Sequence, residues 1–292
     1  MSADVVAAEL SLRLERAGLS DPWTEAAGGT TRTLFSTDGE LYEPARLRFH
    51  DDLIDAALAE MQPEQSGPLT AVITAGPPGA GKTTAIASRA DLVGYRHIDA
   101  DAFKDALLIE SRDSGRLDEW MAQRLSDGRP VSVRELSAFV HAESTAVANR
   151  MRQRSLQHQE NVVILGTLSS TEHLETLLGD LDEHGYEALV VLRAEVPAGT
   201  AVRRSTDRWW TDRCEVRSGL GGRFVPPLVI RELYPSPSAT SAASRCSVNA
   251  EALRRRAEDY GWEVTLVDAV EVVDEVGGAD GSDEADAAAM MD

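Results

Sequence analysis

The sequence predicts an α/β protein built on a doubly wound, mostly parallel sheet. Short apolar runs alternate along the chain with segments of helical periodicity, an alternation typical of βαβ units. The run at 161–165 (NVVIL) has no polar face, as expected of a strand covered on both sides. With 292 residues, of which 42% are hydrophobic, the chain can bury a core of this kind.

The N-terminal part of the chain is predicted to be helical. Apolar residues recur at Val6, Leu10 and Leu14 within 3–17, and a second amphipathic pattern covers 44–61. A polar linker containing proline and glycine follows at 62–68. We interpret residues 1–65 as a helical extension packed on the core rather than as an independent domain.

The core domain, residues 66–270, is predicted to alternate strands and helices. Apolar runs indicate strands at 71–75, 95–98, 161–165, 188–192 and 263–267. Helical patterns occur at 83–90, 102–109, 117–125, 132–157, 173–184, 197–214 and 250–260. Residues 271–292 form an acidic, low-complexity tail that we expect to be disordered.

Charge and composition argue against several classes of protein. The formal net charge of −20 would repel nucleic acid and anionic membranes, so we expect neither as a non-specific partner. Cys214 and Cys246 lack metal-site spacing, and we expect free thiols in a reducing compartment. Without a signal-peptide pattern or an apolar run of membrane-spanning length, the expected location is cytoplasmic.

Residues 70–84 (TAVITAGPPGAGKTT) carry the strongest functional signal. They match the phosphate-loop pattern G-x-x-x-x-G-K-[ST], with a strand-like run before it and a helical run after it. Glycines let backbone amides turn toward phosphate oxygens, and the following helix directs its positive end at them. Lys82 would reach the β- and γ-phosphates, and the Thr83 hydroxyl would bind Mg²⁺. The predicted nucleotide-binding residues are Gly76, Pro77, Pro78, Gly79, Ala80, Gly81, Lys82, Thr83 and Thr84.

Three classes of phosphate-loop protein compete: a small-molecule kinase, a GTPase or ATPase switch, and a nucleic-acid or peptide remodeller. The Asn-Lys-x-Asp element that reads guanine does not occur in the sequence, and the D-x-x-G match at 91–94 follows Lys82 too closely to be meaningful. No apolar run ends in the Asp-Glu pair usual in remodelling ATPases. The kinase is therefore favoured.

Asp99 and Asp101 follow the predicted strand at 95–98. Ligands of an open α/β sheet bind beyond the carboxyl ends of its strands, so both carboxylates are expected at the rim that holds the phosphate loop. Alternation along a strand would point both side chains the same way. One would orient and deprotonate an acceptor hydroxyl, and the other would bind substrate or Mg²⁺. Alternatively, one of them caps the helix beginning near Phe103.

An arginine cluster is out of character in so acidic a chain. It comprises Arg203, Arg204, Arg208, Arg213, Arg217 and Arg223. Guanidinium groups neutralise the charge on a phosphoryl group in transfer and often lie on a lid, here expected at about 198–227. The alternative is a solvated helix face with ion pairs one turn apart.

Thr167 and Glu143 are further substrate-binding candidates. Thr167 follows the strand at 161–165 and so lies at the same rim, but Thr167 or Ser169 can equally cap the next helix. Glu143 lies on the inward side of its helix, where a buried carboxylate needs a partner. Arg150, two turns on, is one such partner; substrate is the partner that we prefer.

Several motifs, including the phosphate loop, occur in order within residues 50–231: GPPGAGKTT, IDADAFK, NVVILGTLSS, VP followed by TDRW, and GRFVPP. In this order they resemble the zeta-toxin family, bacterial kinases that phosphorylate UDP-N-acetylglucosamine. IDADAFK and GRFVPP make the resemblance specific, because phosphate loops alone are common. The resemblance implies a phosphate-loop kinase fold, ATP and Mg²⁺ as cofactors, and a toxin that blocks cell-wall precursor synthesis.

The resemblance also implies roles for individual residues. Lys82 would bind the phosphates, and Asp101 would be the base that activates the 3′-hydroxyl of the sugar. Arg208 and Arg223 would grip the transferring phosphate. Thr167 matches a substrate-binding threonine of the family.

Leu165 departs from the family pattern. Members commonly have Glu-Gly-Thr where this chain has Leu-Gly-Thr, and that glutamate helps to hold the sugar nucleotide. The sequence thus leaves open a kinase of another hydroxyl (nucleoside, antibiotic or other nucleotide-sugar) and a non-enzymatic ATP-binding regulator. The family's usual partner is a small helical antitoxin that blocks the nucleotide site.

Overall fold

The computed structural model describes residues 2–20, 29–37, 41–63, 67–215, 219–235 and 243–269. The predicted acidic tail at 271–292 and Arg217 of the arginine cluster lie outside these residues. Within the described residues, none of the helices is long and apolar enough to cross a membrane. Both cysteines are free thiols, and Cys246 is buried.

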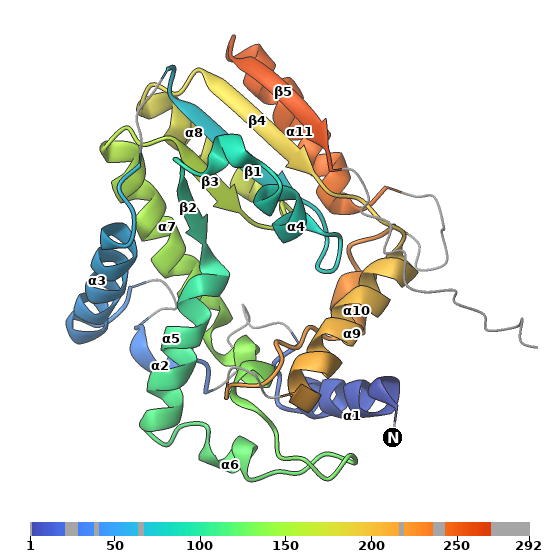
Figure 1. Cartoon of the computed structure of the whole chain (residues 1–292). Helices are drawn as coiled ribbons and strands as arrows, with labels where there is room; N and C mark the ends of the chain where they lie inside the picture. Colours follow the sequence, from blue (N-terminus) through green and yellow to red (C-terminus); the bar gives the residue numbers. More distant parts are fainter. Residues whose placement is uncertain are drawn as a thin grey trace, which may run out of the picture.

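A five-stranded parallel sheet forms the centre of the fold (Figure 1). The strands run in the order β2 (Arg96–Asp99), β3 (Val162–Leu165), β1 (Thr70–Ala75), β4 (Ala188–Arg193) and β5 (Glu263–Asp268). Val72 of β1 lies opposite Val163 of β3 and Val190 of β4. The carboxyl end of β1 therefore lies in the middle of the rim, where ligands of such sheets bind. The predicted doubly wound, mostly parallel α/β fold is confirmed.

The α-helices of the described chain are α1 (Ala3–Arg16), α2 (Thr31–Phe35), α3 (Pro44–Ala59), α4 (Lys82–Ala87), α5 (Ala100–Asp113), α6 (Asp118–Met121), α7 (His141–Gln157), α8 (Glu172–Glu183), α9 (Ala198–Glu215), α10 (Pro227–Arg231) and α11 (Arg245–Asp259). Two 3₁₀ segments, η1 (Ala90–Leu92) and η2 (Val133–Val140), complete the helical structure. Most of the predicted helices are present, with boundaries shifted by a few residues.

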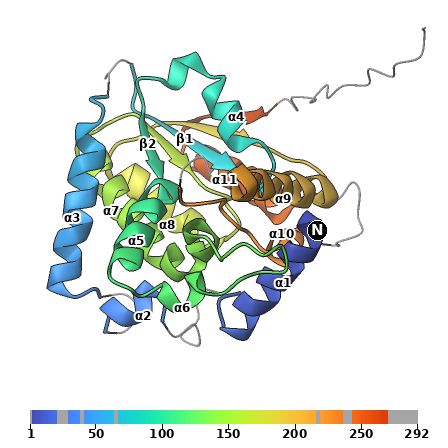
Figure 2. The same ribbon diagram turned by 60° about the horizontal axis from the view of Figure 1, so that its bottom comes forward.

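Helices cover both faces of the sheet (Figure 1 and Figure 2). Alternate residues of β1 point to opposite faces, so Ile73 packs in the large core cluster with α7, α8 and α11. On the other face, Val72 packs with Ile86 of α4 and Leu92 of η1. Because α4 begins at Lys82, directly after the loop, its first turn lies at the rim beside that loop.

The predicted helix at 132–157 is instead two elements, η2 and α7. The backbone leaves helical geometry at Leu136, where φ is −93° and ψ is 20°. Glu135 anchors η2 by accepting a hydrogen bond from Trp209 Nε1 at 2.8 Å. Contacts of this kind join distant parts of the sequence, so a local pattern does not reveal them. The neighbouring α5 also starts earlier than predicted, at Ala100.

The N-terminal helices pack on the core. Leu10 and Leu14 of α1 are buried in one hydrophobic cluster with Trp209 of α9. Ile54 of α3 is buried in the main core cluster together with Val147 of α7. Figure 1 and Figure 2 both show α1 beside α9, the helix that carries most of the arginine cluster.

Candidate active site

The phosphate loop is pressed against the end of β4 and against α9. Gly76, Gly79 and Gly81 have φ values of 147°, 84° and 95°, which favour glycine. A Cβ atom at Gly76 would lie 2.2 Å from the carbonyl oxygen of Ala194, and one at Gly79 would lie 2.2 Å from that of Ala201. The loop therefore tolerates no side chain at these two positions and is held in one shape.

Lys82 begins α4, and its ammonium folds back onto the loop. Nζ donates hydrogen bonds to the carbonyl oxygens of Gly76 at 2.6 Å and Pro77 at 3.0 Å. Burial and the charge of Arg208 lower the pKa of Lys82 to about 8, although nearby Asp101 opposes this shift. Phosphate oxygens at the loop would be stronger partners for the ammonium than these carbonyls.

The position of Thr83 suits a ligand of Mg²⁺. Its side chain is exposed in the first turn of α4 and makes no hydrogen bond within the described residues. No cluster of three or more His, Cys, Asp or Glu side chains that could hold a metal lies in the described part of the chain. Mg²⁺ at phosphate sites needs only one or two protein ligands, with phosphates and water completing its shell. The residues present fit that arrangement, with Thr83 as the protein ligand.

Asp99 ends β2 and is the N-cap of α5. Its Oδ1 accepts a hydrogen bond from the backbone N–H of Asp101 at 2.8 Å, and burial raises the pKa of Asp99. The expectation that both aspartates alternate along a strand is wrong, because the helix begins at Ala100 and Asp101 lies in its first turn. Asp99 thus has the capping role considered as an alternative, and its contact with substrate stays a prediction.

Asp101 is held by two cations, one on each carboxylate oxygen. Lys104 Nζ lies 2.8 Å from Oδ1, and Arg223 Nη1 lies 2.8 Å from Oδ2. These partners hold the pKa of Asp101 well below its usual range despite burial, which raises it. Asp101 also lies close enough to Lys82 for its charge to act on the ammonium. The structure therefore brings the predicted phosphate-binding lysine and the predicted base to one rim.

Arg223 is presented by a tightly packed loop. A Cβ atom at Gly222 would lie 2.3 Å from the carbonyl oxygen of Trp209, and Phe224 is buried against the same tryptophan, with ring centroids 4.8 Å apart. Arg223 Nη2 also lies 3.1 Å from Asp105 Oδ1. Its Nε is buried and has no hydrogen-bond partner among the described residues, so the guanidinium keeps a donor for another group.

Two arginines of the cluster on α9, Arg213 and Arg208, have different surroundings. Arg213 is buried and binds Asp127 at 2.9 Å and Glu135 at 2.7 Å. Its role is structural, but it lies in the interior and pairs with residues outside its own helix, unlike the solvated helix face considered as the alternative. Arg208 is exposed on α9 and makes no ion pair with the described residues. The helix that carries Arg208 packs against the phosphate loop, with Ala201 and Ser205 beside Gly79, and the charge of Arg208 lowers the pKa of Lys82.

Thr167 lies directly beside the phosphate loop. Its carbonyl oxygen accepts a hydrogen bond from the N–H of Gly76 at 3.0 Å, and its hydroxyl donates to Ser169 Oγ at 3.0 Å. Neither hydroxyl caps α8, whose N-cap is Thr171. Leu168 has a φ of 56°, uncommon for a residue with a side chain, which marks a constrained turn. Thr167 remains a candidate substrate ligand at this rim.

Glu143 is fully buried, and protein groups occupy its carboxylate oxygens. Arg46 Nε donates to Oε1 at 2.5 Å and Nη2 to Oε2 at 3.0 Å, while His50 Nε2 lies 2.6 Å from Oε1. Burial raises the pKa of Glu143, but these partners lower it to about 2. Arg150 pairs with Asp51 instead. The expected contact of Glu143 with substrate is therefore wrong: this carboxylate joins α3 to α7.

Three residues of the site were not predicted from the sequence: Lys104, Asp105 and Arg134. Lys104 and Asp105 follow Asp101 by one helical turn, so the helical spacing was a signal for both. Arg134 comes from η2 and binds Asp105 at 3.1 Å and 2.6 Å, completing the support of Arg223. No local pattern connects Arg134 with the site.

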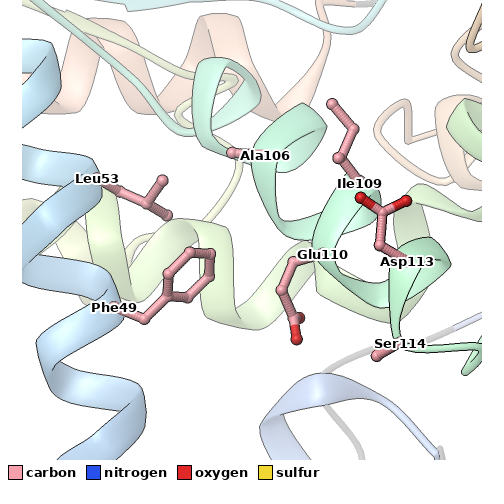
Figure 3. Close-up of a pocket in the computed structure, with 7 residues that line it drawn as sticks. All are labelled: Phe49, Leu53, Ala106, Ile109, Glu110, Asp113 and Ser114. Carbon is pink, nitrogen blue, oxygen red and sulfur yellow. The ribbon is translucent and has the colours of Figure 1, made fainter.

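A groove of about 610 Å³ lies between α3 and α5 (Figure 3). It is lined by Phe49, Leu53, Ala106, Ile109, Glu110, Asp113 and Ser114. None of the phosphate-loop or rim residues lines it. This groove is therefore separate from the candidate active site.

Comparisons with known proteins identify the family. A sequence model of the Zeta toxin family matches residues 54–257, and no curated protein matches the chain. Among solved structures, the PezAT chromosomal toxin–antitoxin system of Streptococcus pneumoniae is 12% identical, with 79% of each chain covered and a TM-score of 0.49. AvrRxo1-ORF1:AvrRxo1-ORF2 with ATP is 20% identical over 56% of this chain and 50% of that one, with a TM-score of 0.38.

A third structure, from Chloroflexus aurantiacus, is 17% identical over 70% of this chain and 87% of that one, with a TM-score of 0.41. All three TM-scores are below 0.5, and nothing about this chain is inferred from these structures. The family match is different in kind, because it covers well over half of the chain and includes the phosphate loop and the rim aspartates. The chain belongs to the Zeta toxin family and has its phosphate-loop kinase fold.

Proposed function

We propose that this protein is a kinase that transfers the γ-phosphoryl group of ATP to the 3′-hydroxyl of the sugar of UDP-N-acetylglucosamine. The observation that carries the proposal is that Asp101 and Lys82 both follow the carboxyl ends of parallel strands of one sheet, β2 and β1, with Arg223 bound to Asp101 at 2.8 Å. A carboxylate, a phosphate-binding ammonium and a guanidinium in one place are the groups that phosphoryl transfer to a hydroxyl requires.

The nucleotide end of the site is built from the loop and α4. Loop amides and Lys82 would hold the β- and γ-phosphates, favoured by the positive end of the helix. Thr83 would bind Mg²⁺, which when present neutralises phosphate charge and orients the γ-phosphoryl group. This chain's own part is a loop whose shape is fixed by contacts of Gly76 and Gly79 with the neighbouring backbone.

The acceptor end is built around Asp101. Its carboxylate would orient the acceptor hydroxyl and take its proton as the oxygen bonds to the γ-phosphorus and the bond to the β–γ bridging oxygen breaks. The products are ADP and a sugar phosphomonoester. A carboxylate with so low a pKa is a weak base, but the loose transition state of phosphoryl transfer relies mainly on positioning and charge stabilisation. Arg208 and Arg223 would supply that stabilisation.

The acceptor is the finer part of the proposal, because Leu165 stands where the family commonly has glutamate. Thr167 supports a substrate contact at the same rim, since its backbone is hydrogen-bonded to the phosphate loop. Phosphorylation of UDP-N-acetylglucosamine would deplete a cell-wall precursor and make the protein a toxin of a toxin–antitoxin pair. The proposed partner is a small helical antitoxin that covers the nucleotide site.

Incubation with γ-labelled ATP and a panel of hydroxyl acceptors tests the proposal. The panel holds UDP-N-acetylglucosamine, other nucleotide-sugars, nucleosides and hydroxyl-bearing antibiotics, with the Lys82→Met variant as the control for contaminating kinases. Label on UDP-N-acetylglucosamine is the expected result. Label on another acceptor alone would overturn the substrate, and label on none would leave an ATP-binding regulator.

A further inference from the structure

The chain uses lysine at only two positions, Lys82 and Lys104, among its 29 Lys and Arg residues. Arginine therefore serves at every other cationic position, including all the other ion pairs described above. The first lysine belongs to the phosphate loop. The second lies at the same rim, bound to the proposed base Asp101. Lys104 is thus one of only two positions at which the sequence has a compact ammonium instead of a guanidinium.

The environment of Lys104 is unlike that of an ordinary helix ion pair. Its residue is only 8% exposed, and its Nζ lies 2.8 Å from Asp101 Oδ1, one turn earlier in α5. Exposed pairs at this spacing stabilise a helix by only a few tenths of a kcal/mol, and burying an ammonium costs more than that. A role in helix stability alone therefore does not account for a buried lysine here.

The difference between ammonium and guanidinium explains the choice. A guanidinium is a planar fork that binds both oxygens of a carboxylate at once, whereas an ammonium is a point charge that can hold one. Lys104 holds Oδ1 of Asp101 and leaves Oδ2 to Arg223. An arginine at position 104 would compete for the oxygen that the acceptor hydroxyl has to reach.

We propose that Lys104 is a positioning residue of the kinase reaction: it fixes Asp101 through Oδ1 so that Oδ2 alone is presented to the acceptor. Arg223 binds Oδ2 until the γ-phosphate draws its guanidinium away, and the rotamer of Asp101 is kept because Lys104 belongs to the same helix. This inference rests on the kinase function proposed above. It adds a residue whose side chain acts through Asp101 and does not touch substrate.

The charged and titratable groups around Asp101 come from several elements. They are Lys104 and Asp105 of α5, Asp99 at the end of β2, Lys82 of α4, Arg223 of the 219–226 loop and His141 of α7. Burial and Lys104 lower the pKa of His141 to about 4. Any test by pH must therefore separate Asp101 from His141.

Lys104→Met and Lys104→Arg in the full chain test the proposal together. For Lys104→Met we expect unchanged ATP affinity, a loss of kcat of about 100-fold, and an acid limb of kcat/KM at least about one pH unit higher. For Lys104→Arg we expect the acid limb to stay in place while kcat falls about tenfold, because the fork covers both oxygens. Arg112→Met, at an exposed ion pair in the last turn of α5, is the control and should behave as wild type.

A merely structural Lys104 predicts a different pattern. Lys104→Arg would then retain wild-type kcat, and Lys104→Met would lower only the melting temperature; either result overturns the proposal. Carboxylate ¹³C NMR, with the Asp101 signal assigned from Asp101→Asn, separates Asp101 from His141 and needs no activity. If the wild type phosphorylates no acceptor, the proposed kinase function is wrong. If the pKa of Asp101 is the same in Lys104→Met as in the wild type, Lys104 does not position Asp101, whatever the outcome of the activity assay.

Discussion

Arg223 Nη1 lies 2.8 Å from Asp101 Oδ2, so the group proposed to bind the transferring phosphate is bound to the proposed base. In the proposed reaction these two groups would have to separate, because Oδ2 would receive the acceptor proton while the guanidinium faces the phosphate. Asp105 also binds Arg223, and Arg223 Nε keeps an unused donor within the described structure. Arrival of the γ-phosphate would then release the proposed base.

Asp101→Asn should bind ATP normally and transfer phosphate poorly. The amide keeps the shape of the carboxylate but cannot take a proton, and general-base groups of this kind contribute about 10²–10⁴ in rate. Calorimetric titration with ATP and single-turnover transfer measure the two effects separately. Near-normal turnover of this variant would show that Asp101 is not the base.

Arg208→Ala should slow phosphoryl transfer by about 100-fold or more, because removal of one charge-stabilising donor has effects of that size. Arg203→Ala is the matched control: Arg203 is also exposed on α9 but projects from another side of the helix. The steady-state kcat of the two variants is compared with that of the wild type, and we expect a large loss only in Arg208→Ala. Equal losses in both would assign the effect to the general charge of α9 rather than to Arg208.

ATP affinity should weaken as the pH rises past about 8. Burial and Arg208 lower the pKa of Lys82 to about 8, so above this pH the free protein holds a neutral amine, whereas bound phosphates favour the ammonium. Binding then takes up a proton, and Kd increases by up to about tenfold per pH unit. Titrations in buffers of different ionisation enthalpy report that proton. Lys82→Arg stays charged, so it should bind ATP more weakly than the wild type but with a Kd that does not change with pH. A Kd that still rises with pH in this variant would show that another group titrates.

Glu143→Gln should destabilise the fold by about 3–5 kcal/mol, because Arg46 would lose its partner inside the protein. Glu110→Gln, which removes a half-exposed partner of the same arginine, should cost far less. Denaturant unfolding gives both values. The KM of Glu143→Gln for the acceptor should equal that of the wild type. A large rise in this KM without loss of stability would show that Glu143 contacts the substrate after all.

Because Glu143 is bound by Arg46 and His50, the free energy of unfolding should fall at low pH, where Glu143 becomes protonated. The folded pKa of Glu143 is about 2, below its usual value of 4.5, so its contribution is fully present above pH 4.5 and is lost as the pH falls through about 2. Chemical unfolding between pH 6 and 2 should show this loss in the wild type. The slope should be reduced in Glu143→Gln, and an unchanged slope would assign it to other carboxylates.

The sheet and the phosphate loop were predictable because their signals are local. The bare apolar run at 161–165 required a strand covered on both faces, and the pattern around Lys82 required a strand, a turn and a helix in that order. The structure contains both. Asp101 was also placed at the correct rim, although by way of a strand geometry that does not apply to the first turn of a helix.

Long-range partners were not predictable. Glu143 is bound by Arg46 and His50, which lie more than ninety residues earlier in the sequence. The partner considered from the sequence, Arg150, lies two turns along the same helix. Arg134 reaches the site only because η2 packs on α5. Such contacts depend on how elements pack, which spacing along a single element does not encode.

The proposed transfer of phosphate to UDP-N-acetylglucosamine can be followed by ³¹P and ¹H NMR in a reaction of the wild-type protein with ATP and Mg²⁺. We expect equal amounts of ADP and of a phosphomonoester on the 3′-hydroxyl of the sugar, with neither formed by Asp101→Asn. Unmodified UDP-N-acetylglucosamine after prolonged incubation, with or without hydrolysis of ATP, would contradict the proposed transfer.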